Sequence, residues 1–246
     1  MNKIKNIYIS YWFSELDFNP SSKIDILEKE IVSIIDTPII YNTDNNLKNI
    51  GIPRIEGISS DKKYLFTMSL VNAFLSININ SDMDNDEILL LINNNSQLFY
   101  DILKNVYNID FIYTSIKLEF IDENKKIKDK LIKLLNLSDN NYEDLSCKRG
   151  IIKDDYYLNY LLTYSKEYNF NVKREEEFVE QDLFDRSMVT SLSDAKFNRE
   201  FLLTVIEIND RYAYNVDSSH RTEKEDIRGM ILELKEILNK ELFWQL

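Results

Sequence analysis

The 246-residue sequence contains very little of the residue types on which most catalytic and cofactor-binding motifs depend. It has one histidine, one cysteine, four glycines and three prolines. Histidine is the usual general base and metal ligand near neutral pH, and glycines build the loops that bind phosphates. The sequence has no Gly-rich phosphate loop, no Cys/His zinc motif and no nucleophile elbow. These absences disfavour an enzyme, and we expect no resident cofactor and no metal site.

Basic charge and long apolar runs are also scarce. The chain has 42 acidic against 30 basic residues, which gives a formal net charge of −12. Nucleic acids and anionic lipids are bound by basic surfaces, so this charge disfavours a nucleic-acid partner. No stretch approaches the ~20 apolar residues of a membrane-spanning helix, and the lone Cys147 cannot form an intramolecular disulfide. We therefore expect a cytoplasmic protein that does not associate with membranes.

The residues that are abundant predict a compact α+β fold. Hydrophobic residues make up 44% of the chain and aromatic residues 12%, which are values of globular proteins. Within residues 1–122, apolar side chains recur with a period of two in some segments and at helical spacing in others. We expect strands at residues 7–13, 64–79 and 112–120, and helices at residues 24–34 and 84–107. This N-terminal half has the order β-α-β-β-α-β, with residues 64–79 forming either a hairpin or one bulged strand.

The remaining chain is divided into a helical connector at residues 123–150 and a C-terminal α+β half at residues 151–246. Within that half we expect a Tyr-rich helix, then a hairpin that turns at Asn209-Asp210, and finally a long helix. The expected ranges are 153–168 for the Tyr-rich helix, 201–208 and 212–216 for the hairpin strands, and 222–243 for the closing helix. Residues 170–192 fit strand and helix equally well. The closing helix begins at Thr222 with a capping box completed by Glu225.

The fold class is therefore α+β, with mainly antiparallel sheets and long amphipathic helices packed on them. A hairpin followed by a long helix occurs twice, at residues 64–107 and 201–243. This repetition is compatible with an internal duplication, although the residue identities of the two segments do not align. The two halves can also form one compact domain.

A family resemblance rests on the order of four short segments. These are Asp61-Lys62-Lys63-Tyr64, Ser76-Ile77-Asn78, the stretch from Ser115 to Asp122, and Glu207-Ile208-Asn209. In this order the chain resembles a sporadically distributed, uncharacterised family of bacterial accessory-genome proteins. The resemblance implies a mobile-element or phage-conflict setting, and it implies no activity or functional residue.

The best-placed polar cluster lies just before the closing helix. It consists of Asp217, Ser218, Ser219, His220 and Arg221. Loop residues next to a helix start can bind an anion together, so Asp217, Ser218, His220 and Arg221 are our candidate binding residues. An ordinary surface loop with an N-cap also accounts for these residues, and it is the favoured interpretation.

Two other acidic sets could bind a metal ion. Glu175, Glu176, Glu177, Glu180, Asp182 and Asp185 supply carboxylates, although their spacing matches no defined metal loop and fits an exposed acidic face. Asp110 with Glu123 and Lys125 has the approximate order of a nuclease trio, in which two carboxylates hold a metal and a lysine polarises water. Glu-x-Lys pairs are frequent in a chain this charged, so the trio is weak evidence.

We therefore predict a non-catalytic protein that binds another macromolecule through aromatic-rich surfaces. The expected partner is a protein, or a second copy of the chain, because tyrosine and tryptophan are the usual anchors of protein interfaces. One alternative is a metal-dependent nuclease or other phosphodiesterase that uses carboxylates. The other is a small-ligand sensor that uses the loop around His220.

Overall fold

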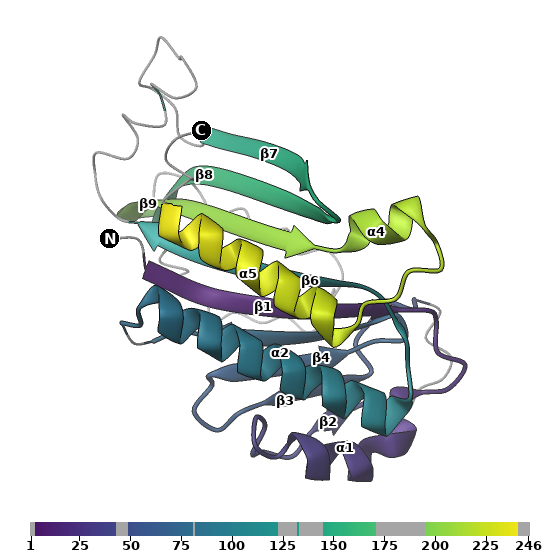
Figure 1. Ribbon diagram of the computed structural model, residues 1–246. Helices are drawn as coiled ribbons and strands as arrows, with labels where there is room; N and C mark the ends of the chain where they lie inside the picture. Colours follow the sequence, from purple (N-terminus) through teal and green to yellow (C-terminus); the bar gives the residue numbers. More distant parts are fainter. Residues whose placement is uncertain are drawn as a thin grey trace, which may run out of the picture.

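The computed structural model describes residues 3–42, 49–80, 82–122, 132, 145–170 and 195–240. These residues form an antiparallel sheet of nine strands with four α-helices (Figure 1), which confirms the predicted α+β class. The strands are β1 (Lys3–Phe13), β2 (Ile40–Tyr41), β3 (Ile55–Ile58), β4 (Tyr64–Met68), β5 (Asn72–Asn78), β6 (Phe111–Asp122), β7 (Leu145–Lys153), β8 (Tyr156–Phe170) and β9 (Ala195–Asn209). Their order across the sheet is β2-β3-β4-β5-β1-β6-β9-β8-β7.

The helices are α1 (Ile24–Ile31), α2 (Asn85–Tyr107), α4 (Arg211–Val216) and α5 (Lys224–Lys240), and a 3₁₀ turn (Pro20–Lys23) leads into α1. The two long helices, α2 and α5, lie side by side across one face of the sheet (Figure 1). The start of α2 is fixed by a capping box between Asp84 and Glu87, and its end by Asn108 in the left-handed conformation. None of the described helices has the length and apolar character needed to cross a membrane.

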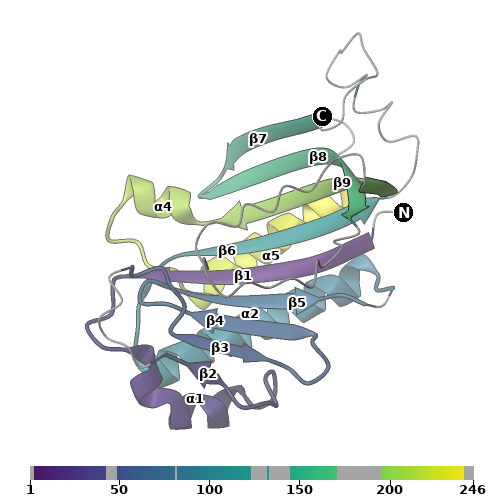
Figure 2. The ribbon, with the colours of Figure 1, turned by 180° about the vertical axis from the view of Figure 1, so that it is seen from behind.

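The alternation of side chains along the strands gives the sheet two different faces. The helix face packs against α2 and α5, and β1 contributes Ile7, Ile9 and Tyr11 to it, all fully buried. The opposite face, here called the outer face, carries the alternate residues of the same strands and is turned to the viewer in Figure 2. One hydrophobic core runs along the helix face and includes residues of both halves, from Ile7 in β1 to Leu238 in α5.

The sheet has a mirrored order about its centre. Each half of the chain supplies one long strand, then a meander that ends beside that strand, then a long helix. The first half gives β2-β3-β4-β5-β1 and the second gives β6-β9-β8-β7, joined by the antiparallel β1–β6 pair, so the first half has one additional short strand, β2. The two halves therefore share an order of elements that is longer than the predicted hairpin and helix.

Three predicted elements are wrong. Residues 145–150, assigned to a helical connector, belong to β7, and residues 153–168, predicted as a Tyr-rich helix, lie mostly in β8. Residues 212–216, predicted as a strand, lie in α4. The β8 prediction fails because helical spacing and strand alternation both fit the same side chains, and sheet pairing with β7 and β9 decides between them. Most of the connector and residues 171–192 of the ambiguous segment lie outside the described residues.

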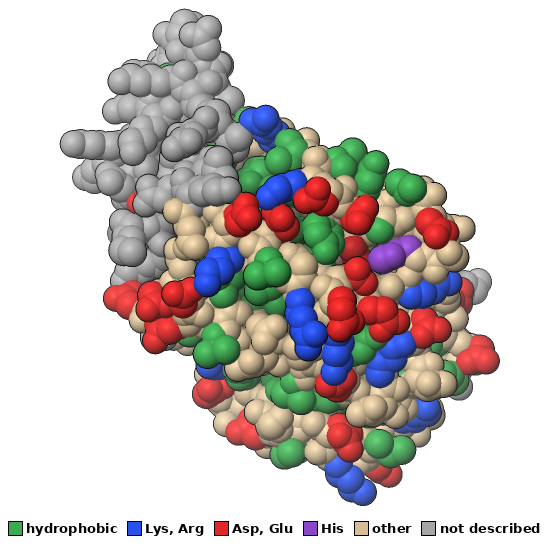
Figure 3. Space-filling model, viewed as in Figure 1, with side chains coloured by type: hydrophobic (Ala, Val, Ile, Leu, Met, Phe, Trp, Pro, Cys, Tyr) green, Lys and Arg blue, Asp and Glu red, His purple; other side chains and the backbone are tan. Residues whose placement is uncertain are grey.

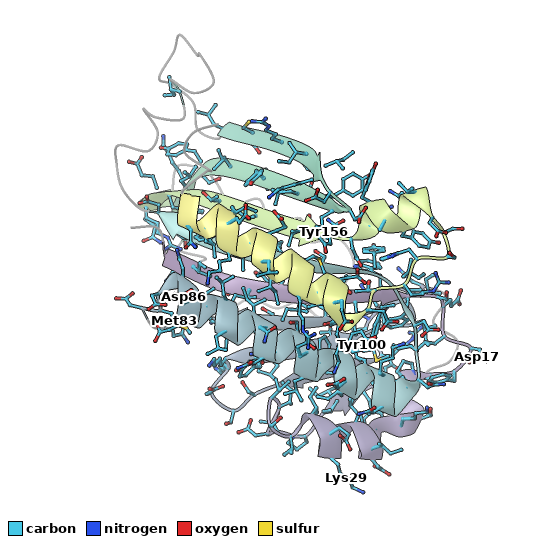
Figure 4. All side chains as sticks on the ribbon, viewed as in Figure 1. Asp17, Lys29, Met83, Asp86, Tyr100 and Tyr156 are labelled. Atoms are coloured by element: carbon cyan, nitrogen blue, oxygen red, sulfur yellow. The ribbon has the colours of Figure 1, made fainter. Side chains whose placement is uncertain are left out.

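A close contact fixes α5 on the sheet. Gly229, in the middle of α5, faces the ring of Tyr156 from β8, and a Cβ atom at Gly229 would lie 2.1 Å from the Tyr156 hydroxyl oxygen. That hydroxyl donates to the backbone carbonyl of Asp226 at 3.4 Å. Figure 4 shows Tyr156 beside α5. Glycine is favoured here because any side chain at this position would have to displace the tyrosine.

Candidate functional site

The predicted binding loop, residues 217–221, joins α4 to α5. Asp217 accepts hydrogen bonds from the backbone nitrogen of Ser219 at 2.9 Å and from its hydroxyl at 2.7 Å. Arg221 donates to the backbone carbonyls of Ser218 and His220 at 3.0 and 2.6 Å. The side chains of Asp217 and Arg221 therefore bond within the loop, and the bonds to Ser219 lower the pKa of the Asp217 carboxyl. This is the arrangement of an ordinary surface loop.

His220 does not turn towards the serines of its own loop. Its Nε2 atom lies 3.2 Å from Oδ2 of Asp210, the residue that follows β9. Asp210 is 1% exposed and also accepts hydrogen bonds from the Thr114 backbone nitrogen and the Thr222 hydroxyl, both at 2.6 Å. Burial raises the pKa of the Asp210 carboxyl, and these hydrogen bonds oppose the rise. The histidine itself is visible at the surface in Figure 3.

The predicted capping box at Thr222 is not formed. Helix α5 begins at Lys224, and the Thr222 hydroxyl donates to Asp210 instead of capping the helix. The Asp226 carboxylate accepts a hydrogen bond from the backbone nitrogen of Glu223 at 2.7 Å. The helix start is thus shifted by about one residue, and Thr222 helps to hold the buried carboxylate.

The other predicted acidic sets are only partly described. Asp110 forms an ion pair of 2.6 Å with Lys104, and this bond lowers the pKa of the Asp110 carboxyl. Glu123 and Lys125, the remaining members of the nuclease trio, lie outside the described residues, as do the acidic side chains between residues 175 and 185. The described part of the trio is a surface ion pair.

The outer face contains a groove, here called the sheet-face groove, that was not predicted from the sequence. This sheet-face groove has a volume of about 580 Å³. Its floor is formed by small and polar residues at the same level of three neighbouring strands, Ser10 in β1, Ser115 in β6 and Asn209 in β9. Phe74 of β5 and Tyr157 of β8 stand at the same level beyond the floor, one on each side. The groove exists because two serines interrupt the large side chains of the outer face.

Two stacked groups flank the floor along the strand direction. On one side, Tyr8 stacks on Phe74 with ring centroids 5.5 Å apart, and the Lys117 ammonium lies 4.0 Å from the centre of the Tyr8 ring. Such contacts between a cation and a ring face are attractive and hold the cation in place. This flank of the groove therefore carries a positive charge beside aromatic rings.

On that other side, Trp12 stacks on Tyr113 with centroids 5.4 Å apart, and the Arg211 guanidinium lies 5.5 Å from the Tyr113 ring. Arg211 is the first residue of α4, so this short helix closes one end of the groove. The positions of Trp12 and Tyr113 opposite each other in the β1–β6 pair account for the stacking.

The groove is locally positive in an acidic chain. Among its described lining residues are three cations, Lys117, Lys148 and Arg211, and one carboxylate, Glu207, which sum to +2. Lys117 forms an ion pair with Glu119 at 3.1 Å, whereas neither Lys148 nor Arg211 forms an ion pair with any described residue. Two positive charges are therefore available to a ligand or partner.

The carboxylate of the groove is bound by neutral donors. Glu207 accepts hydrogen bonds from the Ser115 hydroxyl at 2.9 Å and from the Asn159 side-chain amide at 3.2 Å. Its neighbours therefore orient Glu207 without neutralising its charge.

The alternation of Tyr8, Ser10 and Trp12 in β1 was the one signal for the groove in the sequence, but the partners of β1 in the sheet cannot be read from the sequence.

The chain matches no protein-family model, and no curated protein matches its sequence.

Proposed function

We propose that this chain is a non-catalytic protein-binding protein and that the sheet-face groove receives its partner. The observation that carries the proposal is the residue content of the groove. Trp12, Tyr113 and Arg211 form one stacked group there, and tryptophan, tyrosine and arginine are the residues most enriched at the energetic centres of protein interfaces. The accessory-genome resemblance favours a mobile-element or phage-conflict setting for this interaction.

The contacts of the aromatic rings favour a protein over a nucleic acid. The Tyr8 ring contacts both the Phe74 ring and the Lys117 ammonium. The Tyr113 ring likewise contacts both the Trp12 ring and the Arg211 guanidinium. Proteins that bind single-stranded nucleic acid offer free ring faces on which bases stack. The net charge of −12 adds a repulsion against any polyanion.

The charges of the groove define the chemistry of the partner. Lys148 and Arg211 can pair with an acidic side chain, and the Ser10 hydroxyl of the floor can bond a peptide backbone. The acidic surface as a whole attracts a basic protein and does not repel a neutral one. We therefore propose a partner with a basic or neutral surface that inserts at least one acidic side chain into the groove.

The proposal is tested by recovering the partner from the native host and then measuring its affinity with purified components. We expect Trp12→Ala and Arg211→Glu each to weaken binding by at least ~10-fold, because truncation or reversal at such anchors costs 1.4 kcal/mol or more. Lys235→Glu, an exposed charge reversal in α5 on the other side of the sheet, is the matched control and should bind like the wild type.

Two results would overturn the proposal. One is the absence of any stoichiometric partner together with a monomeric state. The other is a reconstituted complex whose affinity is the same for Arg211→Glu, Trp12→Ala and the wild type.

A small ligand is a second candidate occupant, favoured by the volume of the groove. About 580 Å³ lies within the range of small-molecule sites. In this case a sensor would use Arg211 in the groove and not the His220 loop of the sequence-based alternative. A screen of small anions by thermal shift distinguishes these two ligand sites. An anion that binds in the groove should no longer raise the melting temperature of Arg211→Ala but should still raise that of Arg221→Ala.

A further inference from the structure

Three potential metal ligands converge at one end of the helix face. They come from separate parts of the chain: Asp210 follows β9, His220 belongs to the loop before α5, and Asp226 lies in the first turn of α5. One ligand atom from each residue lies within 4.8 Å of the other two. The closest pair, His220 Nε2 and Asp210 Oδ2, are 3.2 Å apart. Ligand atoms about 3 Å apart are what a single ion with bonds of about 2 Å requires.

The cluster contains two carboxylates, and a bound cation could balance their negative charge. Asp210 is buried and Asp226 is partly buried, and no lysine or arginine in the described part of the chain forms an ion pair with either. Burying a carboxylate without a cation is costly. Thr114, whose backbone nitrogen donates to Asp210, also has a buried hydroxyl with no hydrogen-bond partner among the described residues. Asp210 itself is hydrogen-bonded, so the unsatisfied buried group beside it is the Thr114 hydroxyl.

We propose that Asp210, His220 and Asp226 bind a divalent transition-metal ion. One imidazole nitrogen and two carboxylate oxygens suit Zn²⁺, Mn²⁺ or Fe²⁺, whereas Mg²⁺ and Ca²⁺ prefer sites made of oxygen alone. Two carboxylates also balance the charge of the ion. The proposal differs from the two acidic sets considered in the sequence, since it uses the only histidine and residues that the fold brings together from three segments.

The neighbours of the cluster already hold the ligands in orientation. Thr222 and the Thr114 backbone donate to Asp210, and the Glu223 backbone donates to Asp226. Hydrogen bonds of this kind fix metal-binding carboxylates and are part of a metal site. A bound ion would tie the end of β9 to the start of α5, so the proposed role of the site is structural.

The test uses the full-length protein without a histidine tag, treated with a chelator and then dialysed. Titration calorimetry with Zn²⁺ and with Mn²⁺ should show one site per chain for at least one of these ions, and Mg²⁺ should not compete at equal concentration. His220→Ala and Asp226→Asn should each weaken binding by at least ~10-fold, since each removes one of only three protein ligands. Asp217→Asn, in the same loop but bonded to Ser219, is the matched control and should bind like the wild type.

Asp226→Asn keeps an oxygen that can accept the hydrogen bond from Glu223, so this variant tests the site even if His220→Ala does not fold. In the wild type, Co²⁺ should give a visible absorption spectrum that Zn²⁺ abolishes. The proposal is wrong if the wild type binds neither Zn²⁺ nor Mn²⁺ at one site per chain. It is also wrong if a folded His220→Ala or Asp226→Asn protein binds as tightly as the wild type.

Discussion

The two faces of the sheet differ most clearly at two adjacent residues of β1. Tyr11 points to the helix face, is fully buried, and donates its hydroxyl to the backbone carbonyl of Ser96 in α2 at 2.8 Å. Trp12 points to the outer face, where it stacks on Tyr113 beside the groove. Both are large aromatic residues with a polar atom, yet one joins a helix to the sheet and the other borders a cavity. Their residue types alone do not reveal this difference in role.

The largest expected effect comes from replacing these two neighbours in turn. Tyr11→Ala should reduce the free energy of unfolding by ~3–5 kcal/mol, because it leaves a cavity against Phe99 and Phe111 and removes the hydrogen bond to Ser96. Trp12→Ala should cost only ~1 kcal/mol, the scale of a single aromatic pair. Urea denaturation of both variants measures the difference. Equal losses of stability would show that the two faces are not distinct in their contribution to folding.

A smaller effect is expected where α5 crosses the sheet. Gly229→Ala should destabilise the protein by about 1–3 kcal/mol, because the new methyl group overlaps the Tyr156 hydroxyl. This value is the net loss, after subtraction of the ~1 kcal/mol that alanine gains over glycine within a helix. Thermal unfolding of Gly229→Ala, Tyr156→Phe and the double variant gives the coupling.

The double variant should be more stable than the sum of the single effects predicts, since removing the hydroxyl relieves the overlap. Strict additivity would mean that the helix does not approach β8 as closely as the structure shows. The contact between Gly229 and Tyr156 would then no longer support the close packing of the helix face.

The smallest effect concerns the pH dependence of stability at Asp210. Burial raises the pKa of this carboxyl above its ordinary value of 3.8, so its protonated form is favoured in the folded state. The stability of the wild type relative to Asp210→Asn should therefore be highest below pH 3.8 and fall as the pH rises through the raised pKa. Urea denaturation of both proteins in excess chelator, from pH 3.5 to pH 6 as a working range, measures this difference. A difference that grows with pH would contradict the direction of the shift.

The long periodic elements of the fold were predictable from the sequence. The helix expected at residues 84–107 is α2, and the strand expected at residues 112–120 lies within β6, because each repeats one spacing over many residues. The C-terminal half was harder. In β8, Tyr157, Tyr160 and Tyr164 fit a helix, while Leu158, Tyr160, Leu162 and Tyr164 are the residues that the strand buries on the helix face. Only pairing with the neighbouring strands selects the second pattern.

The candidate sites show the same limit more sharply. The loop at residues 217–221 is polar in the sequence, but the partner of His220 is Asp210, a residue predicted to lie in a hairpin turn. The sheet-face groove combines residues of β1, β5, β6, β8 and β9, and its floor depends on Ser10 and Ser115 meeting across the β1–β6 pair. These two residues are more than one hundred positions apart. No local pattern indicates such a contact.

The two outermost strands have a consequence for how the molecule meets others. β2 has only two residues, and β7 exposes Lys148 and Arg149 along its length. Short strands and repeated positive charges at the margins of a sheet hinder the addition of a strand from another chain. Each margin therefore resists the backbone pairing that leads to aggregation, although nine strands lie in an open array. Recognition is thereby directed to side chains on the broad surface of the sheet, where sequence rather than backbone determines which partner fits.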